Sequence, residues 1–280
     1  CVYDCISAKM VEEAGFEAMC LSGAELAASY RGLPDIGLMT LSDLEDNVRR
    51  IAAASPLPMI VDIDTGFGNE LNTIETCKRI AAAGAMAVHL EDQTFPKRCG
   101  HLRGKQVIAM EDYISKVKAA VYALQGTDCM LIARTDAFAV NGKEDAIARA
   151  CAAIEAGADM TLIEATDSVE AIAEIGKRVP GLKMFGMNAN GVHPQVTGSE
   201  LEAFGYHLIT MHYTCSAAIH GMREFGRHCF ADKDDAYVYE TYSSKVGPIP
   251  LHTMFGIHEW LQLGAQFNHE IQDAKPLEER

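Results

Sequence analysis

Four segments of the chain repeat one pattern of hydrophobic and polar positions. Each contains the end of an amphipathic helix, then a glycine suited to a left-handed helix cap, then a short apolar run that ends in polar residues. These segments are residues 12–23, 81–92, 154–165 and 202–213. Each one therefore predicts a helix, a glycine cap and a buried strand in succession.

Three further apolar runs predict strands without the preceding helix and glycine, at residues 58–64, 130–136 and 184–189. The predicted strands are continuously apolar rather than alternating, which is typical of parallel strands covered on both faces. Helical patterns separate them, and these begin at Ser42, Leu71, Glu111 and Lys143. Two helix starts have the spacing of a capping box, Ser42 with Glu45 and Thr197 with Glu200.

The alternation of strands and helices predicts one α/β domain over residues 1–280. Seven strand candidates, with an eighth whose signal is too weak to identify, favour a (β/α)8 barrel of the TIM type. The alternative is an open, doubly wound sheet, although no GxGxxG motif follows the first strand. After about Ala231 a polar stretch leads to a last helix near residues 258–272. We expect residues 231–280 to be a C-terminal helical extension that makes oligomer contacts.

Composition excludes several classes of protein. The formal net charge of −15 disfavours nucleic acid and anionic membranes as partners. The chain contains neither an apolar run of the roughly 18 residues that span a bilayer nor a signal-peptide pattern, so we expect a cytoplasmic location. Nine cysteines without paired loop spacings predict free thiols in a reducing compartment. An anionic substrate would require a local concentration of cations, and residues 95–105 form the densest basic cluster.

Acidic side chains follow two of the predicted strands. Asp62 and Asp64 are two residues apart on one strand, so we expect both carboxylates on one side, and Glu91 ends the next strand. Three acids with no basic partner of their own form an oxygen-rich site that suits Mg2+ or Mn2+ better than zinc. The alternative is that the carboxylates only cap neighbouring backbone amides.

Other polar residues end the remaining strands, where a barrel of this kind has its chemistry. Arg134 has a planar fork suited to a substrate carboxylate, or it forms an ion pair with Asp136 or Glu164. Asn188 either donates to a substrate oxygen or satisfies the loop backbone.

A cysteine lies in the basic segment FPKRCGHLRG, which has no helical or strand periodicity. Because Lys97 and Arg98 flank Cys99, we expect a lowered thiol pKa, suited to proton transfer or nucleophilic attack. The alternative is a surface thiol in an anion-binding loop. Gly100 and Gly104 make the segment permissive enough to close over a substrate as a lid.

Six stretches together resemble the isocitrate lyase and phosphoenolpyruvate mutase superfamily, in that superfamily's order and over nearly the whole chain. They are LSG (21–23), GLPDIG (32–37), VDIDTGFGN (61–69), EDQTFPKRCGH (91–101), ARTDA (133–137) and the Asn-containing turn at 187–189. The resemblance implies a (β/α)8 barrel whose last helix is exchanged between subunits, as a homotetramer of helix-swapped dimers, and a bound Mg2+.

The resemblance also implies roles for individual residues. Asp62 would bind the metal directly, and Asp64, Glu91 and Asp35 largely through metal-bound water. The backbone of residues 22–24 and the side chain of Arg134 would hold the keto-acid part of the substrate. We expect the full substrate-binding set to be Ser22, Gly23, Ala24, Gly100, Arg134, Glu164, Asn188 and Thr214.

The KRCGH sequence resembles the carbon–carbon lyase branch, because the phosphonate mutases lack this cysteine. Lyases of that branch cleave a 2-hydroxy acid to a 2-keto acid and a carboxylate. Cys99 would protonate the departing carbanion, with Lys97, Arg98 and His101 supplying positive potential. KRCGHLRGK resembles the loop of enzymes that cleave 2-alkylmalates such as dimethylmalate more than the KRCGHRPNK of methylisocitrate lyases.

Three alternatives stay open from the sequence. The same scaffold can hydrolyse or decarboxylate oxaloacetate. A phosphoenolpyruvate mutase or phosphonopyruvate hydrolase is disfavoured by Cys99. A catalytically silent barrel that binds a dicarboxylate would have no need of a loop thiol.

Overall fold

The computed structural model describes residues 1–189, 191–242 and 247–267 of the chain. Contacts divide the chain into two units, Cys1–Cys215 and Ser216–Arg280. The first unit contains the sheet and every residue of the predicted site.

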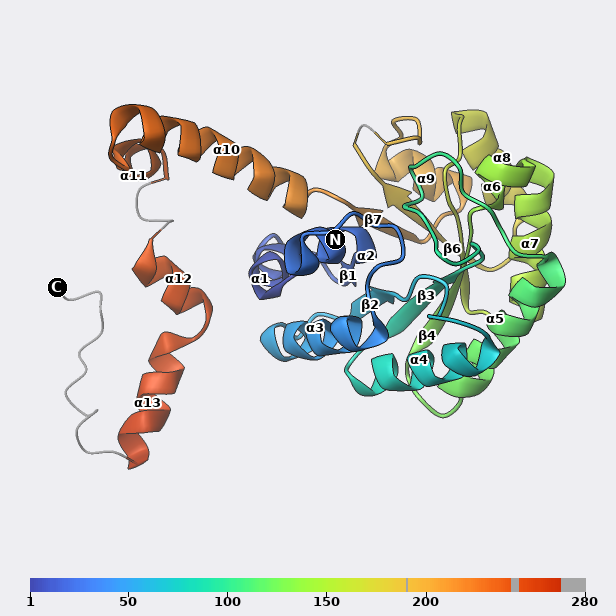
Figure 1. Ribbon diagram of the computed structural model, residues 1–280, viewed down its shortest axis with the longest axis horizontal. Helices are drawn as coiled ribbons and strands as arrows, with labels where there is room; N and C mark the ends of the chain where they lie inside the picture. Colours follow the sequence, from blue (N-terminus) through green and yellow to red (C-terminus); the bar gives the residue numbers. More distant parts are fainter. Residues whose placement is uncertain (190, 243–246, 268–280) are drawn as a thin grey trace. The chain divides into compact units, whose positions relative to one another are not determined.

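Seven parallel strands form one sheet, in the order in which they occur along the chain (Figure 1). The strands are β1 (Met19–Leu21), β2 (Met59–Asp62), β3 (Ala87–Glu91), β4 (Met130–Thr135), β5 (Met160–Ile163), β6 (Leu182–Met187) and β7 (Leu208–Met211). Each overlaps one of the seven predicted strand segments, so these predictions are confirmed. The doubly wound alternative is wrong, because such a sheet reverses its strand order partway across.

Residues 1 and 2 lie between the two edge strands of this sheet. Val2 forms a parallel bridge with Leu21, and the nitrogen of Cys1 donates to the carbonyl oxygen of Met211 at 2.6 Å. Val2 thereby occupies the place of an eighth strand, and the sheet becomes a nearly closed barrel. The predicted TIM-type fold is confirmed.

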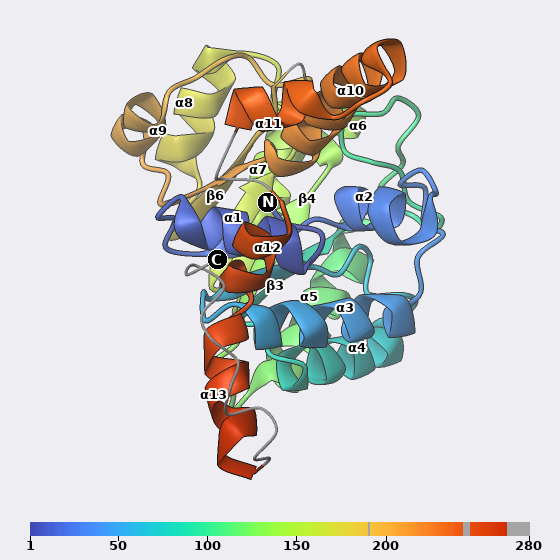
Figure 2. The same cartoon turned by 90° about the vertical axis from the view of Figure 1, so that its left-hand side faces the viewer.

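Helices alternate with the strands along the first unit. They are α1 (Cys5–Glu13), α2 (Gly23–Leu26), the π-helix η1 (Ala27–Arg31), α3 (Leu41–Ala54), α4 (Glu70–Ala82), α5 (Met110–Leu124), α6 (Ala137–Asn141), α7 (Lys143–Glu155), α8 (Val169–Arg178) and α9 (Gly198–Phe204). Helices α3, α4 and α5 pack in sequence against the β2–β4 side of the sheet (Figures 1 and 2). Leu21, Val61, Val88 and Leu131 are buried between the strands and these helices.

The start of α3 differs from the prediction. Thr40 and Asp43 form its capping box, with Asp43 N donating to Thr40 Oγ1 at 3.2 Å. Glu45 forms ion pairs with Arg49 and Arg79 instead. Two overlapping pairs with the correct spacing occur here, so spacing alone could not identify the cap. The predicted box of Thr197 and Glu200 is confirmed at α9.

The second unit is helical. It contains most of α10 (Thr214–Asp232) and all of α11 (Ala236–Tyr242), α12 (Pro248–Met254) and α13 (Ile257–Phe267). The predicted last helix corresponds to α13 up to Phe267, and residues 268–272 lie outside the described part. A role of this unit in oligomer contacts stays a prediction. In the described ranges, no helix is both long and apolar enough to cross a membrane.

Candidate active site

The predicted site residues gather at the C-terminal ends of the barrel strands. Asp62 is the last residue of β2 and Glu91 the last of β3, Arg134 lies at the end of β4, and Glu164 and Asn188 directly follow β5 and β6. In a barrel of parallel strands these ends converge on one face. The strand ends predicted from the sequence therefore place these residues on one face of the barrel.

Asp62 and Asp64 lie together, although not as two residues of one strand. Strand β2 ends at Asp62, and Asp64 has a φ of 49°, in the left-handed region. Its backbone N–H donates to Asp62 Oδ1 at 3.0 Å. The backbone of Gly23 packs against this pair, because a Cβ on Gly23 would lie 3.1 Å from Asp62 Oδ2 and 3.3 Å from Asp64 Oδ1. The turn therefore brings the carboxylates and the predicted substrate-binding backbone together.

These acids do have basic partners, so the expectation of none was wrong. Lys97 Nζ lies 2.6 Å from Asp64 Oδ1 and 2.7 Å from Asp35 Oδ1, with a side chain that is only 1% exposed. Arg134 Nη2 lies 3.2 Å from Glu91 Oε2. The partners come from β4 and from the cysteine loop, far from Asp62 in sequence, so local inspection of the motif could not reveal them.

The protonation of the three acids differs. Burial opposes the charge of Asp62, but the positive charges of His89, Lys97 and Arg134 lower its pKa to about 2. Burial raises the pKa of Asp64 to about 6 in spite of Lys97. Burial also raises the pKa of Glu91 well above its usual value, against the charge of Arg134. Asp62 is therefore the acid most readily available as an anionic ligand.

Several carboxylate oxygens in this cluster lack hydrogen-bond partners. Both Glu91 oxygens and Asp64 Oδ1 are buried and make no hydrogen bond within the described residues, although cations lie nearby. The Lys97 ammonium nevertheless lies 2.6 Å from Asp64 Oδ1 and Arg134 Nη2 lies 3.2 Å from Glu91 Oε2, so these two oxygens have charged neighbours. Buried oxygens of this kind need a partner, and hard cations such as Mg2+ bind carboxylate oxygens. The residues fit the predicted metal.

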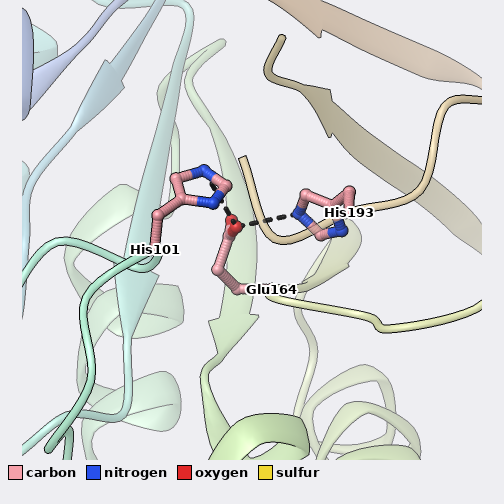
Figure 3. Close-up of side chains that lie close together, drawn as sticks. All are labelled: His101, Glu164 and His193. Carbon is pink, nitrogen blue, oxygen red and sulfur yellow. Dashed lines mark hydrogen bonds and ion pairs between the residues drawn. The ribbon is translucent and has the colours of Figure 1, made fainter. Parts of the chain in front are cut away.

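A second cluster lies at the ends of β5 and β6. Glu164 Oε1 is 3.0 Å from His193 Nε2 and 3.8 Å from His101 Nε2, so the carboxylate lies between two imidazoles (Figure 3). One ligand atom from each residue lies within 4.8 Å of the others, a spacing compatible with a metal ion. The N–H of Val192, however, donates to His101 Nδ1 at 3.1 Å. The amide nitrogen of Asn188 lies 3.0 Å from the other ring nitrogen, Nε2, so both nitrogens of His101 already contact N–H groups of the chain, which disfavours His101 as a metal ligand.

The protonation of this second cluster is set by its neighbours. Burial opposes the charge of Glu164, but Arg134 and the hydrogen bond from His193 hold its pKa well below the usual value. Burial lowers the pKa of His101, in agreement with a neutral ring. His193 was missed by the sequence analysis. Its Nδ1 lies 2.8 Å from Thr166 Oγ1, which fixes the ring beside Glu164. It lies in an irregular segment several residues beyond β6, where no periodicity marks it.

Cys99 is half-buried in the loop between β3 and α5, and its N–H donates to the carbonyl oxygen of Asp35 at 3.0 Å. Burial raises its pKa, so the expected lowering was wrong. The flanking cations are directed elsewhere: Lys97 binds carboxylates, and the exposed Arg98 donates to the carbonyl oxygen of Arg103 at 3.0 Å. The thiol is accordingly protonated at neutral pH.

The remaining predicted residues lie in three places. Gly100 packs so tightly that a Cβ would lie 2.6 Å from Glu164 Cγ and 2.8 Å from Arg134 Nη2. The Asn188 amide lies 3.0 Å from His101 Nε2, so both belong to the second cluster. Ser22 caps α2, which contains Ala24, and the intervening Gly23 packs against Asp62 and Asp64. Thr214 instead donates to the carbonyl oxygen of Cys1 at 2.8 Å, at the seam between β7 and residues 1–2.

Comparisons with known proteins agree with this geometry. The sequence profile of a family described as phosphoenolpyruvate phosphomutase matches residues 1–229. The carboxyvinyl-carboxyphosphonate phosphorylmutase of Arabidopsis thaliana is 38% identical over 275 residues, covering 95% of this chain and 79% of that protein. A solved 2,3-dimethylmalate lyase of the PEP mutase/isocitrate lyase superfamily has a TM-score of 0.92 and 32% identity, covering 99% of this chain and 92% of its own. An oxaloacetate acetylhydrolase bound to 3,3-difluorooxalacetate has a TM-score of 0.90 and 32% identity, covering 95% of this chain and 91% of its own.

Proposed function

Because the chain belongs to the phosphoenolpyruvate phosphomutase family, within the PEP mutase/isocitrate lyase superfamily, we propose that it is a Mg2+-dependent carbon–carbon lyase. It cleaves a 2-hydroxy di- or tricarboxylate, of the 2-alkylmalate or 2-methylisocitrate kind, to a 2-keto acid and a carboxylate. The observation that carries the proposal is Cys99, a half-buried thiol with a raised pKa in a loop packed against Arg134 and Glu164.

The thiol supplies the proton that this reaction needs. The substrate hydroxyl loses a proton, the C2–C3 bond breaks, and its electron pair passes to the carbon next to the departing carboxylate. Cys99 S–H then protonates that carbon, and the thiolate recovers a proton equivalent to the one lost from the hydroxyl. A raised pKa keeps the thiol protonated and ready to act as an acid.

The chain's own groups orient the substrate for this step. Arg134, with the backbone of residues 22–24, holds the keto-acid end, and His101 with Asn188 lines the Glu164 side of the site. Lys97 places positive charge beside the acidic cluster. Asp62, with Asp64, Glu91 and Asp35, would hold Mg2+ or Mn2+, which stabilises negative charge that develops on the substrate oxygens.

Oxaloacetate hydrolysis or decarboxylation is the second candidate, and it is supported by the oxaloacetate acetylhydrolase neighbour. The loop sequence KRCGHLRGK supports a 2-alkylmalate over 2-methylisocitrate. We also expect a cytoplasmic homotetramer with exchanged C-terminal helices. Sedimentation of the intact chain beside a chain that ends after residue 231 tests the role of that extension.

Product analysis tests the reaction. The protein with Mg2+ is incubated separately with 2,3-dimethylmalate, 2-ethylmalate, 2-methylisocitrate and oxaloacetate, and products are identified by NMR. We expect a keto acid and a carboxylate from one hydroxy acid, and their loss in Cys99→Ala. Oxalate and acetate from oxaloacetate alone would select the second candidate. Binding of these acids without turnover of any would select the silent barrel.

A further inference from the structure

The loop that carries Cys99 is closed at its base. Gln93 and Val107 form an antiparallel bridge, and Thr94 N donates to the carbonyl oxygen of Gln106 at 2.9 Å. Between these ends, residues 94–106 form one loop beside the site. Two lysines of this loop, Lys97 and Lys105, are buried. Lys97 contacts the acidic cluster, whereas Lys105 has no part in the proposed reaction.

Lys105 joins the loop to a fixed point of the barrel. Its ammonium donates to the carbonyl oxygen of Gly100 at 2.5 Å and to Asp136 Oδ1 at 2.7 Å. The side chains of Lys105 and Asp136 are 2% and 0% exposed. A buried ammonium with two charge-assisted partners is a strong connection, because breaking it leaves an uncompensated buried charge.

Asp136 cannot move with the loop. Its N–H donates to Asp92 Oδ1 at 2.9 Å, and Thr135 and Arg149 donate to the other oxygen of Asp92. The Asp136 carboxylate also accepts from Arg134 Nε at 2.9 Å. One carboxylate therefore holds both the substrate-binding guanidinium and, through Lys105, the carbonyl of the residue that follows Cys99.

We propose that Lys105 is a positioning residue that latches the Cys99 loop closed by linking the Gly100 carbonyl to the Asp136 carboxylate that orients Arg134. The latch places the thiol over the site only while Gly100 lies against Arg134 and Glu164. The effect of the latch on catalysis rests on the proposed lyase function. The closure itself is a property of the loop and can be measured without any substrate.

Alkylation of Cys99 by iodoacetamide, followed by peptide mass mapping, measures closure directly. We expect Lys105→Met to increase the alkylation rate at Cys99 at least about tenfold, because loss of a charge-assisted bond of this kind opens the loop. Cys151, half-buried on α7, serves as an internal standard whose rate stays unchanged. Lys183→Met is the matched control, because Lys183 is also buried but donates only to the carbonyls of Val179 and Gly181.

Further variants separate the latch from general destabilisation. Lys105→Arg retains the charge and both donations, and is expected to restore slow alkylation in part. If Lys105→Met does not fold, as shown by circular dichroism, Lys105→Gln replaces it. With the reactive substrate, we expect kcat to fall and the Mg2+ affinity to stay constant. A folded Lys105→Met or Lys105→Gln protein with wild-type alkylation at Cys99 would overturn the latch. If Lys105→Met speeds Cys99 alkylation but the protein cleaves none of the hydroxy acids, the latch is supported and only the lyase proposal is refuted.

Discussion

The two halves of the site differ in how well their polar atoms are satisfied. On the β2–β3 side, Glu91 and Asp64 have buried oxygens without hydrogen-bond partners in the described ranges. On the β5–β6 side, Glu164 accepts from His193, and His193 is fixed in turn by Thr166. Glu91 and Glu164 are both buried, so burial alone does not explain the difference.

This difference supports the two roles that we propose for the halves. Buried carboxylate oxygens without hydrogen bonds are unfavourable unless a ligand completes them, which supports the proposal that the β2–β3 side receives a cation. A hydrogen-bonded network is rigid, which supports the proposal that the β5–β6 side is a preorganised surface for substrate. The Cys99 loop contacts both sides, with Lys97 on the first and Gly100 on the second.

The largest effect is expected from Cys99→Ser, which removes the proton donor that we propose to act between the two halves. Turnover should fall about 10²- to 10⁴-fold, because general acid catalysis contributes that range. KM should change little, since the thiol acts on the departing carbanion. Steady-state kinetics on the substrate found by NMR measures both values. An unchanged kcat would place the proton donor elsewhere.

Gly100→Ala should have the next largest effect, by pushing the loop away from the β5–β6 side. The added Cβ would clash with Glu164 and Arg134, which costs about 10- to 100-fold in kcat/KM at the usual penalty for overpacking. Gly221→Ala is the control, because a Cβ there meets no atom within 4 Å. Equal activity of the two variants would show that the loop does not close against these residues.

His193→Gln should lower the affinity for substrate about tenfold, as expected for a residue that acts by orienting a substrate-binding residue, here Glu164. Its imidazole holds Glu164 beside Arg134, whereas it touches none of the β2–β3 acids. The substrate Kd and the Mg2+ Kd, both measured by calorimetry, should therefore respond differently. A loss of Mg2+ affinity as large as the loss of substrate affinity would show that the two halves of the site act as one unit.

The pH dependence of Cys99 alkylation gives the smallest effect. Because burial raises the thiol pKa, the reactive thiolate is scarce at neutral pH, and the midpoint should lie above that of a model thiol. The rate must rise with pH, since deprotonation creates the nucleophile. Mass mapping across a pH series gives the midpoint, with denatured protein as reference. A midpoint below the reference would restore the expectation of an activated thiolate.

The sequence predicted the fold and the face of the barrel because apolar runs and strand ends are local signals. Asp62, Glu91 and Arg134 were found in this way. The partners of these residues were not predictable, because Lys97 and Arg134 reach the acids only through tertiary folding. The direction of the Cys99 pKa shift failed for the same reason, because the burial that raises the thiol pKa is a result of tertiary folding, as is the pairing of Lys97 with Asp35 and Asp64.

Calorimetric titration of Mg2+ into wild-type protein, Glu91→Gln and Glu164→Gln tests the central claim most directly. Both variants replace a buried carboxylate by an amide of the same shape, one in each half of the site. We expect Glu91→Gln to weaken Mg2+ binding about 10- to 100-fold and Glu164→Gln to leave it unchanged. Weaker binding in Glu164→Gln with wild-type affinity in Glu91→Gln would place the cation among the imidazoles and contradict the account.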